Sequence, residues 1–218
     1  MNIFFDLDGT LTDPSEGITR CLEYAVIGAG GMSHSRKELT KYIGPPLRDS
    51  LQELLPKADD VQLNRAIGMY RRRYSSHGMF ENRLYPDISR MLDELDDLGH
   101  SMWVVTAKPH HFAEKILDFL EISSSFRGVY GPELSDEVVR KQAFIRQALN
   151  DNSLSAHEAV MVGDRSYDVH AAREEGVYAI GVLWGFGSRE ELESAGADLL
   201  INTPGELTGA IQQLGISR

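Results

Sequence analysis

The sequence predicts an α/β protein with a doubly wound parallel sheet and an early all-helical insertion. From residue 86 onward, short apolar runs alternate with amphipathic helical patterns, which is typical of parallel strands joined by helices. Runs such as MWVV and AVMV are apolar at consecutive positions, as expected for strands covered on both faces. Residues 14–85 show only helical patterns. We therefore predict a core domain formed by residues 1–13 and 86–218, and a helical domain formed by residues 14–85.

The core domain is expected to contain six strands and four helices. Each predicted strand is a short apolar run, and each predicted helix has an amphipathic period with Pro or Gly near its ends. The predicted strands are Asn2–Asp6, Ser101–Thr106, Phe126–Tyr130, Ala159–Gly163, Val177–Leu183 and Asp198–Ile201. The predicted helices are Asp87–Leu98, Pro109–Leu120, Asp136–Asn150 and Tyr167–Glu175.

The helical domain separates the first two strands of the core. An insertion of about 70 residues is far longer than a single crossover connection, and Pro14 and Pro86 flank it as hinge markers. The predicted helices of this domain are Gly17–Ala29, Arg36–Tyr42, Leu47–Leu55 and Val61–His77.

Composition excludes several classes of partner. The 22 basic and 33 acidic residues give a net charge of −11, which disfavours nucleic acid or an anionic membrane as the partner. Cys21 is the only cysteine, so neither an intrachain disulfide nor a thiolate metal cluster can form. No apolar run approaches the roughly 20 residues of a membrane span. We expect a cytoplasmic protein that binds neither nucleic acid nor membrane.

Acidic and hydroxyl side chains follow three of the predicted strands. These segments are DLDGT (6–10), TAK (106–108) and GDRSYD (163–168). Because ligands of open parallel sheets bind beyond the carboxyl ends of the strands, we expect these side chains to lie together. Carboxylates without sulfur or imidazole neighbours suit Mg²⁺. An EF-hand loop starting at Asp6 is excluded, since Leu11 and Gly17 occupy the positions that require Gly and Glu.

The order of these motifs resembles that of the haloacid dehalogenase-like hydrolase superfamily over essentially the whole chain. The segments IGPPL (43–47), VVTAKP (104–109), GDRSYD (163–168) and GVLWGFGS (181–188) are most similar to its phosphoglycolate phosphatase and bacterial 5′-nucleotidase-like branch. The resemblance implies a Rossmann-like core, a helical cap formed by the insertion, and Mg²⁺-dependent hydrolysis of a phosphomonoester.

The resemblance also implies roles for four aspartates. Asp6 would be the nucleophile that forms an aspartyl-phosphate. Asp8 would be the general acid toward the leaving oxygen and then the general base toward water. Mg²⁺ would be held by the Asp6 side chain, the Asp8 carbonyl and Asp164, with Asp168 in or behind the ligand shell.

The phosphoryl group would be bound by Thr106 and a lysine, together with Gly9, Thr10 and the backbone at Ala107. We favour Lys141 as this lysine, because it begins a helix after the third strand, where the family places its motif lysine. The alternative is Lys108, which precedes a helix start.

Four questions stay open at this stage. Gly44 and Arg48 of the cap are candidates for substrate contact or for a simple connection between helices. The WGFG segment (184–187) either borders the site or packs on the core. The substrate is expected to be a small phosphorylated metabolite, with phosphoglycolate slightly preferred over nucleoside monophosphates. A β-phosphoglucomutase-like phosphomutase and a non-enzymatic binding protein are the competing classes.

Overall fold

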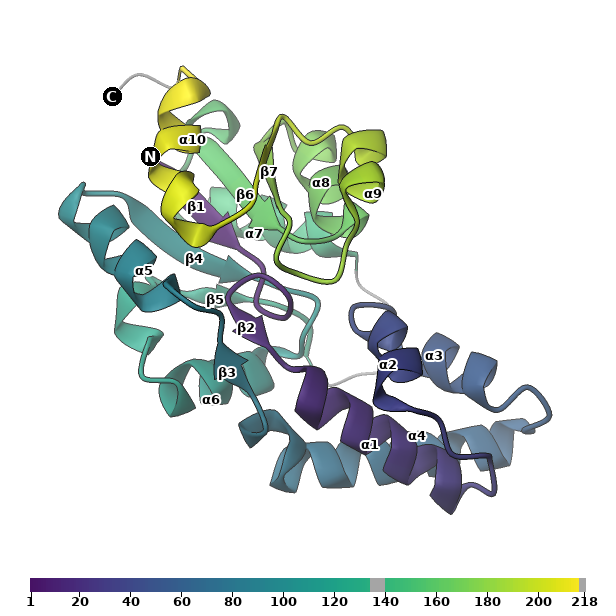
Figure 1. The fold of residues 1–218 in the computed structure, drawn as a ribbon. Coiled ribbons are helices and arrows are strands. Elements are labelled where there is room, and N and C mark those ends of the chain that lie inside the picture. The colour runs from purple at the N-terminus through teal and green to yellow at the C-terminus, as the bar shows by residue number, and fades with distance from the viewer. Residues whose placement is uncertain (134–139, 216–218) are drawn as a thin grey trace. The chain divides into compact units, whose positions relative to one another are not determined.

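A computed structural model describes residues 1–133 and 140–215 of the chain (Figure 1). The chain forms two units, one of Met1–Thr12 with Leu84–Arg218 and the other of Asp13–Arg83. No helix of the described residues combines the length and apolarity that crossing a membrane requires.

The first unit is built on a six-stranded sheet with the order β5-β4-β1-β6-β7-β8. All of its strand pairs are parallel, which confirms the predicted α/β class. The predicted strand 126–130 is reduced to two residues. The strands are β1 (Asn2–Phe5), β4 (Ser101–Val105), β5 (Val129–Tyr130), β6 (Ala159–Gly163), β7 (Tyr178–Val182) and β8 (Leu199–Ile201).

Among the described residues, six α-helices belong to the same unit. Four correspond to predicted helices, with ends that shift by a few residues, and α9 and α10 were not predicted. These two helices have seven residues each, about two turns, which is too short for a clear period. Residues 134–139 lie outside the described residues, and with them the predicted helix start at Asp136. The helices are α5 (Ile88–Asp97), α6 (His110–Phe119), α7 (Lys141–Asp151), α8 (Ser166–Glu174), α9 (Arg189–Ala195) and α10 (Leu207–Gln213).

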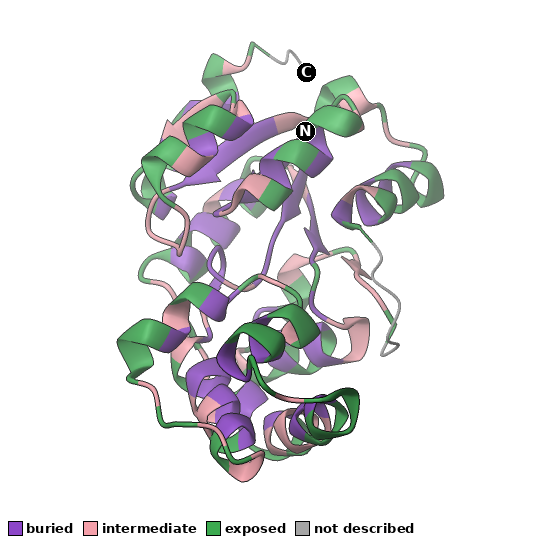
Figure 2. Ribbon diagram, turned by 90° about the vertical axis from the view of Figure 1, so that its right-hand side faces the viewer, coloured by how far each residue is buried: buried purple, intermediate pink, exposed green. Residues whose placement is uncertain are grey.

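Helices cover both faces of the sheet, which explains why its strands are apolar at consecutive positions. On one face, side chains of α7, α8 and α9 share a buried cluster with Phe4, Trp103 and Met161. Helices α5 and α10 contact each other on the other side of the sheet (Figure 1). The central strands are accordingly buried along almost their whole length (Figure 2).

The second unit is helical, as its sequence pattern suggests. Side chains that accept hydrogen bonds from the first turn mark two helix starts: Ser35 caps α2 and Asp59 caps α4, each within a capping box. A 3₁₀ turn, Thr40–Tyr42, completes the predicted helix 36–42. The helices are α1 (Ser15–Gly28), α2 (Arg36–Leu39), α3 (Leu47–Leu54) and α4 (Asp60–Ser76).

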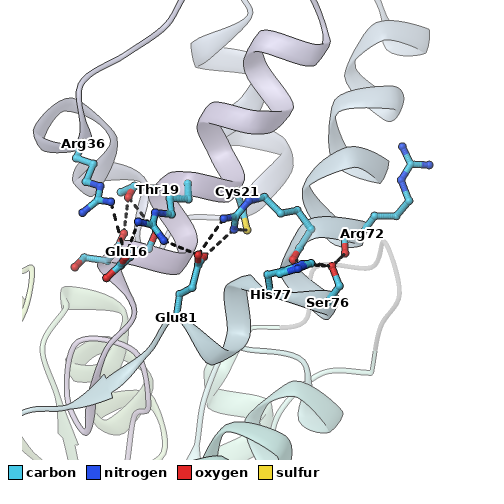
Figure 3. Close-up of polar contacts among 11 residues, drawn as sticks. Glu16, Thr19, Cys21, Arg36, Arg72, Ser76, His77 and Glu81 are labelled. Carbon is cyan, nitrogen blue, oxygen red and sulfur yellow. Dashed lines mark hydrogen bonds and ion pairs between the residues drawn. The ribbon is translucent and has the colours of Figure 1, made fainter.

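A network of ion pairs within this unit joins α1, α4 and the segment that follows α4 (Figure 3). The Glu81 carboxylate lies 2.7 Å from the Arg20 guanidinium and 2.8 Å from that of Arg73. Arg73 also donates a hydrogen bond to the Cys21 sulfur. The two guanidinium groups lower the pKa of Glu81 to about 2, with Arg73 contributing most.

Two short strands lie where the chain passes from one unit to the other. These are β2 (Thr12–Asp13) and β3 (Arg83–Leu84), which pair with each other. Asp13 and Arg83 form an ion pair of 2.6 Å. The sequence analysis did not predict these strands, because two residues are too few to show an alternating pattern.

Candidate active site

The carboxyl ends of three adjacent strands bring the predicted site residues together. In the order β4-β1-β6, the residues that follow the strand ends are Thr106, Asp6 and Asp164. The Asp6 N–H donates to the Val162 carbonyl at 2.9 Å, which continues the β1–β6 ladder to the site. Neighbouring parallel strands in register therefore deliver these side chains to one edge of the sheet.

A tight turn separates the two aspartates of the DLDGT segment. The Leu7 carbonyl accepts hydrogen bonds of 3.0 Å from the N–H groups of Leu11 and Thr12, and the Leu7 and Leu11 side chains are fully buried. Gly9 has a φ of +89°, a conformation that other residues rarely adopt. The buried leucines fix the turn, so the carboxylates of Asp6 and Asp8 reach different partners.

Three buried carboxylates form a cluster at this edge. Asp6, Asp164 and Asp168 each offer one oxygen, and these oxygens lie within 4.8 Å of one another. Asp168 reaches the cluster from the first turn of α8, where its Oδ2 accepts the Arg165 N–H at 3.0 Å. All three residues are less than a tenth exposed, and such a cluster is costly unless cations offset its charge.

Two lysines bring positive charge to the site. Lys141, the first residue of α7, lies 2.9 Å from Asp6 Oδ1 and also donates to Asp168. Lys108 lies 2.5 Å from Asp8 Oδ2. The side chains of both lysines are only 6% exposed. The structure thus brings both candidate lysines into the site, each against different acids.

The sequence analysis favoured Lys141 over Lys108, because Lys108 precedes Pro109 at a predicted helix start and its side chain was expected to point outward. Helix α6 instead begins at His110, and the Lys108 N–H donates to the Thr106 hydroxyl oxygen at 3.2 Å. This local turn buries Lys108 and leaves Ala107 exposed. The signal in the sequence that pointed to Lys108 was its position, within three residues of the end of β4.

Burial and like charges shift the pKa values of the acids. Burial, then Asp168 and Asp6, raise the pKa of Asp164 to about 8. Burial also raises the pKa of Asp168 to about 6, although Lys141 opposes the shift. The pKa of Asp8 is raised by burial against the influence of Lys108. The cluster thus carries more negative charge than its surroundings stabilise.

With the geometry established, comparison with known proteins identifies the family. A family model described as haloacid dehalogenase-like hydrolase matches residues 3–182. The chain belongs to this family. The match covers β1 to β7, and with them every strand end that contributes to the site.

Several relatives of this hydrolase carry phosphatase names. A 5′-nucleotidase from Pseudomonas aeruginosa is 38% identical over 88% of this chain and 87% of its own length. A phosphoglycolate phosphatase from Aquifex aeolicus is 28% identical over 94% and 93%. A crystal structure of a predicted phosphatase from Clostridium acetobutylicum superposes with a TM-score of 0.90 at 37% identity, over 97% and 98% of the two chains. The prediction of this superfamily is confirmed.

The residues of this hydrolase fit a divalent cation. If all are ionised, the four carboxylates of Asp6, Asp8, Asp164 and Asp168 and the two ammonium groups of Lys108 and Lys141 sum to −2. One divalent cation offsets that charge. Oδ1 of Asp8 is buried and has no hydrogen-bond partner among the residues that the structure describes. An oxygen-only donor set of this kind suits Mg²⁺.

The remaining predicted residues fall into two groups. Thr106, at the end of β4, and Thr10, in the turn after β1, are both buried, and Thr10 Oγ1 lies 3.4 Å from Asp164 Oδ1. Gly44 and Arg48 belong to the helical unit. There Arg48 donates to Asn64 and lies 3.7 Å from Asp60. A role of Gly44 and Arg48 in substrate binding stays a prediction.

Proposed function

We propose that this protein is a Mg²⁺-dependent phosphomonoester hydrolase that acts on a small phosphorylated metabolite through an aspartyl-phosphate on Asp6. The observation that carries the proposal is the buried carboxylate cluster at the strand ends, with Lys141 bridging Asp6 and Asp168. Family membership supports the same reaction class.

In the proposed reaction, an Asp6 carboxylate oxygen attacks phosphorus and the bond from phosphorus to the ester oxygen breaks. Asp8, whose pKa burial raises, gives its proton to the departing oxygen. Asp8 then takes a proton from water as that water attacks phosphorus, which releases inorganic phosphate and restores the Asp6 carboxylate. The proton count closes, because Asp8 ends protonated as it began.

The other residues bind and orient. Asp6, Asp164 and the Asp8 carbonyl would hold Mg²⁺, with Asp168 in support. Bound Mg²⁺ supplies charge neutralisation for the phosphoryl oxygens and lets an anionic substrate approach an acidic site. Lys141 and Thr106, with backbone N–H groups near Ala107 and Gly9, would stabilise the negative charge that develops on the phosphoryl group.

The substrate class follows from the relatives. The similarity to the 5′-nucleotidase is greater than that to the phosphoglycolate phosphatase, so we propose nucleoside monophosphates first and phosphoglycolate second. This reverses the slight preference drawn from the motifs alone. A net charge of −11 agrees with small-molecule rather than nucleic-acid substrates. A cytoplasmic location also stays a proposal.

The test is phosphate release by this chain. p-Nitrophenyl phosphate, the four ribonucleoside monophosphates and phosphoglycolate are assayed with Mg²⁺ and with EDTA. Asp6→Asn should abolish turnover, whereas Asp118→Asn, on the exposed surface of α6, should retain it. Turnover that is unaffected by EDTA, or full activity of the Asp6→Asn protein, would contradict the proposal.

A further inference from the structure

Residues 184–187, Trp-Gly-Phe-Gly, pass next to the carboxylate cluster after β7. The Phe186 N–H donates to Asp164 Oδ2 at 2.8 Å. The Trp184 indole Nε1 donates to the Thr10 carbonyl at 2.9 Å. The segment therefore contacts both the acid that follows β6 and the turn that carries Asp6 and Asp8.

The two glycines of this segment allow its close approach. A Cβ atom on Gly185 would lie within 3.0 Å of the Asp164 side chain and the Gly9 carbonyl. A Cβ on Gly187 would collide with the Asp164 carbonyl. Neither glycine has a positive φ, so space rather than backbone conformation requires glycine at both positions. The backbone of the segment packs directly against Asp164.

Core packing alone does not account for these contacts. All four residues of the segment are partly exposed, whereas Asp164 is fully buried. The Phe186 N–H donates to Asp164 Oδ2, and the Thr10 hydroxyl lies next to Asp164 Oδ1. A buried carboxylate held at both oxygens has its rotation fixed, which a metal ligand requires.

We propose that residues 184–187 are a positioning segment for the cation site. The Phe186 N–H orients the Asp164 carboxylate, and the Trp184 indole anchors the segment to the Thr10 carbonyl. Mg²⁺ affinity therefore depends on a backbone N–H and an indole side chain that do not touch the cation. The inference rests on the proposed function, since it assumes that Mg²⁺ binds at Asp164.

Two variants test this proposal. Trp184→Phe removes the indole N–H and keeps an aromatic ring, and Gly185→Ala adds a methyl group against Asp164. Gly209→Ala is the matched control, because a Cβ at Gly209 in α10 meets nothing within 4 Å. Mg²⁺ is titrated into metal-free protein by isothermal titration calorimetry, and the Tm of each protein is measured with and without Mg²⁺.

Loss of a group that orients a metal ligand typically weakens affinity by about 10- to 100-fold. We expect the Kd for Mg²⁺ to rise about tenfold in Trp184→Phe and further in Gly185→Ala, with no change in Gly209→Ala. The metal-free Tm of Trp184→Phe should stay near that of the parent, and high Mg²⁺ should restore its turnover. If Gly185→Ala fails to fold, the Mg²⁺ affinity of Trp184→Phe alone tests the proposal.

The outcomes separate the two proposals. A parent protein that binds Mg²⁺, with Trp184→Phe binding within twofold of it, would overturn the positioning role and leave the proposed function standing. A parent protein that does not bind Mg²⁺ would overturn the proposed function and this inference with it. Weaker binding in Trp184→Phe with an unchanged metal-free Tm supports the inference, because a purely structural contact would lower Tm instead.

Discussion

Replacing Asp164 with asparagine should stabilise the metal-free protein at alkaline pH and remove its stabilisation by Mg²⁺. Asp164 is fully buried, and its pKa of about 8 lies far above the usual value of 3.8 for an aspartate. The folded protein therefore binds a proton at Asp164 that the unfolded chain has lost. The free energy of unfolding must fall as pH rises from about 4 to about 8.

The magnitude follows from the distances within the cluster. The carboxylate oxygens lie within 4.8 Å of one another, and two unit charges at that limit repel by about 3.5 kcal/mol at an effective dielectric constant of about 20. Asp168 and Asp6 both repel an ionised Asp164, and Lys141 offsets part of that repulsion. We expect Asp164→Asn to be more stable than the parent by roughly 1 to 2 kcal/mol at pH 9 without metal. The difference should vanish near pH 5, where Asp164 is protonated.

Urea denaturation in EDTA at pH 5 and pH 9 measures both differences, and comparing variant with parent cancels the other titrating groups. Repeating the pH 9 experiment with Mg²⁺ should reverse the ranking. At 100 times its Kd, Mg²⁺ adds about 2.7 kcal/mol to the parent and little to Asp164→Asn. The reasoning is refuted if the variant is less stable than the parent at pH 9 in EDTA, or if the difference is equal at both pH values.

Three further predictions concern Mg²⁺ binding, Lys108 and the Glu81 ion pairs of the helical unit. Mg²⁺ binding should release protons near neutral pH, and the affinity for Mg²⁺ should increase as pH rises toward 8, because the clustered acids hold protons until the cation binds. Calorimetry in buffers of different ionisation enthalpy measures the number of protons released. Lys108→Met should slow hydrolysis of an alkyl phosphate more than hydrolysis of p-nitrophenyl phosphate. Lys108 contacts Asp8, and the p-nitrophenolate leaving group needs little protonation by Asp8. Equal losses for the two substrates would indicate that Lys108 binds the phosphate directly. Glu81→Gln should lower stability by about 1 to 2 kcal/mol at pH 7, since Arg73 and Arg20 lower the pKa of Glu81 to about 2 and partial exposure screens the pairs. This difference should shrink as pH falls from about 4.5 toward 2.

The sequence carried most of the information about the sheet and the cluster of acids. A buried parallel strand such as Ala159–Gly163 appears directly as an apolar run, and the aspartate that follows it marks the edge at which ligands bind. Contacts between residues that are distant in the chain produce no such pattern in the sequence. The hydrogen bond from Phe186 to Asp164 spans 22 residues and that from Trp184 to Thr10 spans 174, so the WGFG segment stayed ambiguous until the fold was known.

The pairing of acids with lysines explains how two aspartates only two residues apart can take different parts in one reaction. Asp6 faces Lys141 and the other carboxylates of the cluster, where a bound cation would offset the negative charge and leave Asp6 in place as the nucleophile. Asp8 turns away to Lys108, and burial still raises its pKa, which favours a proton carrier. The different roles proposed for Asp6 and Asp8 thus depend on the turn at Leu7 as much as on the acids themselves.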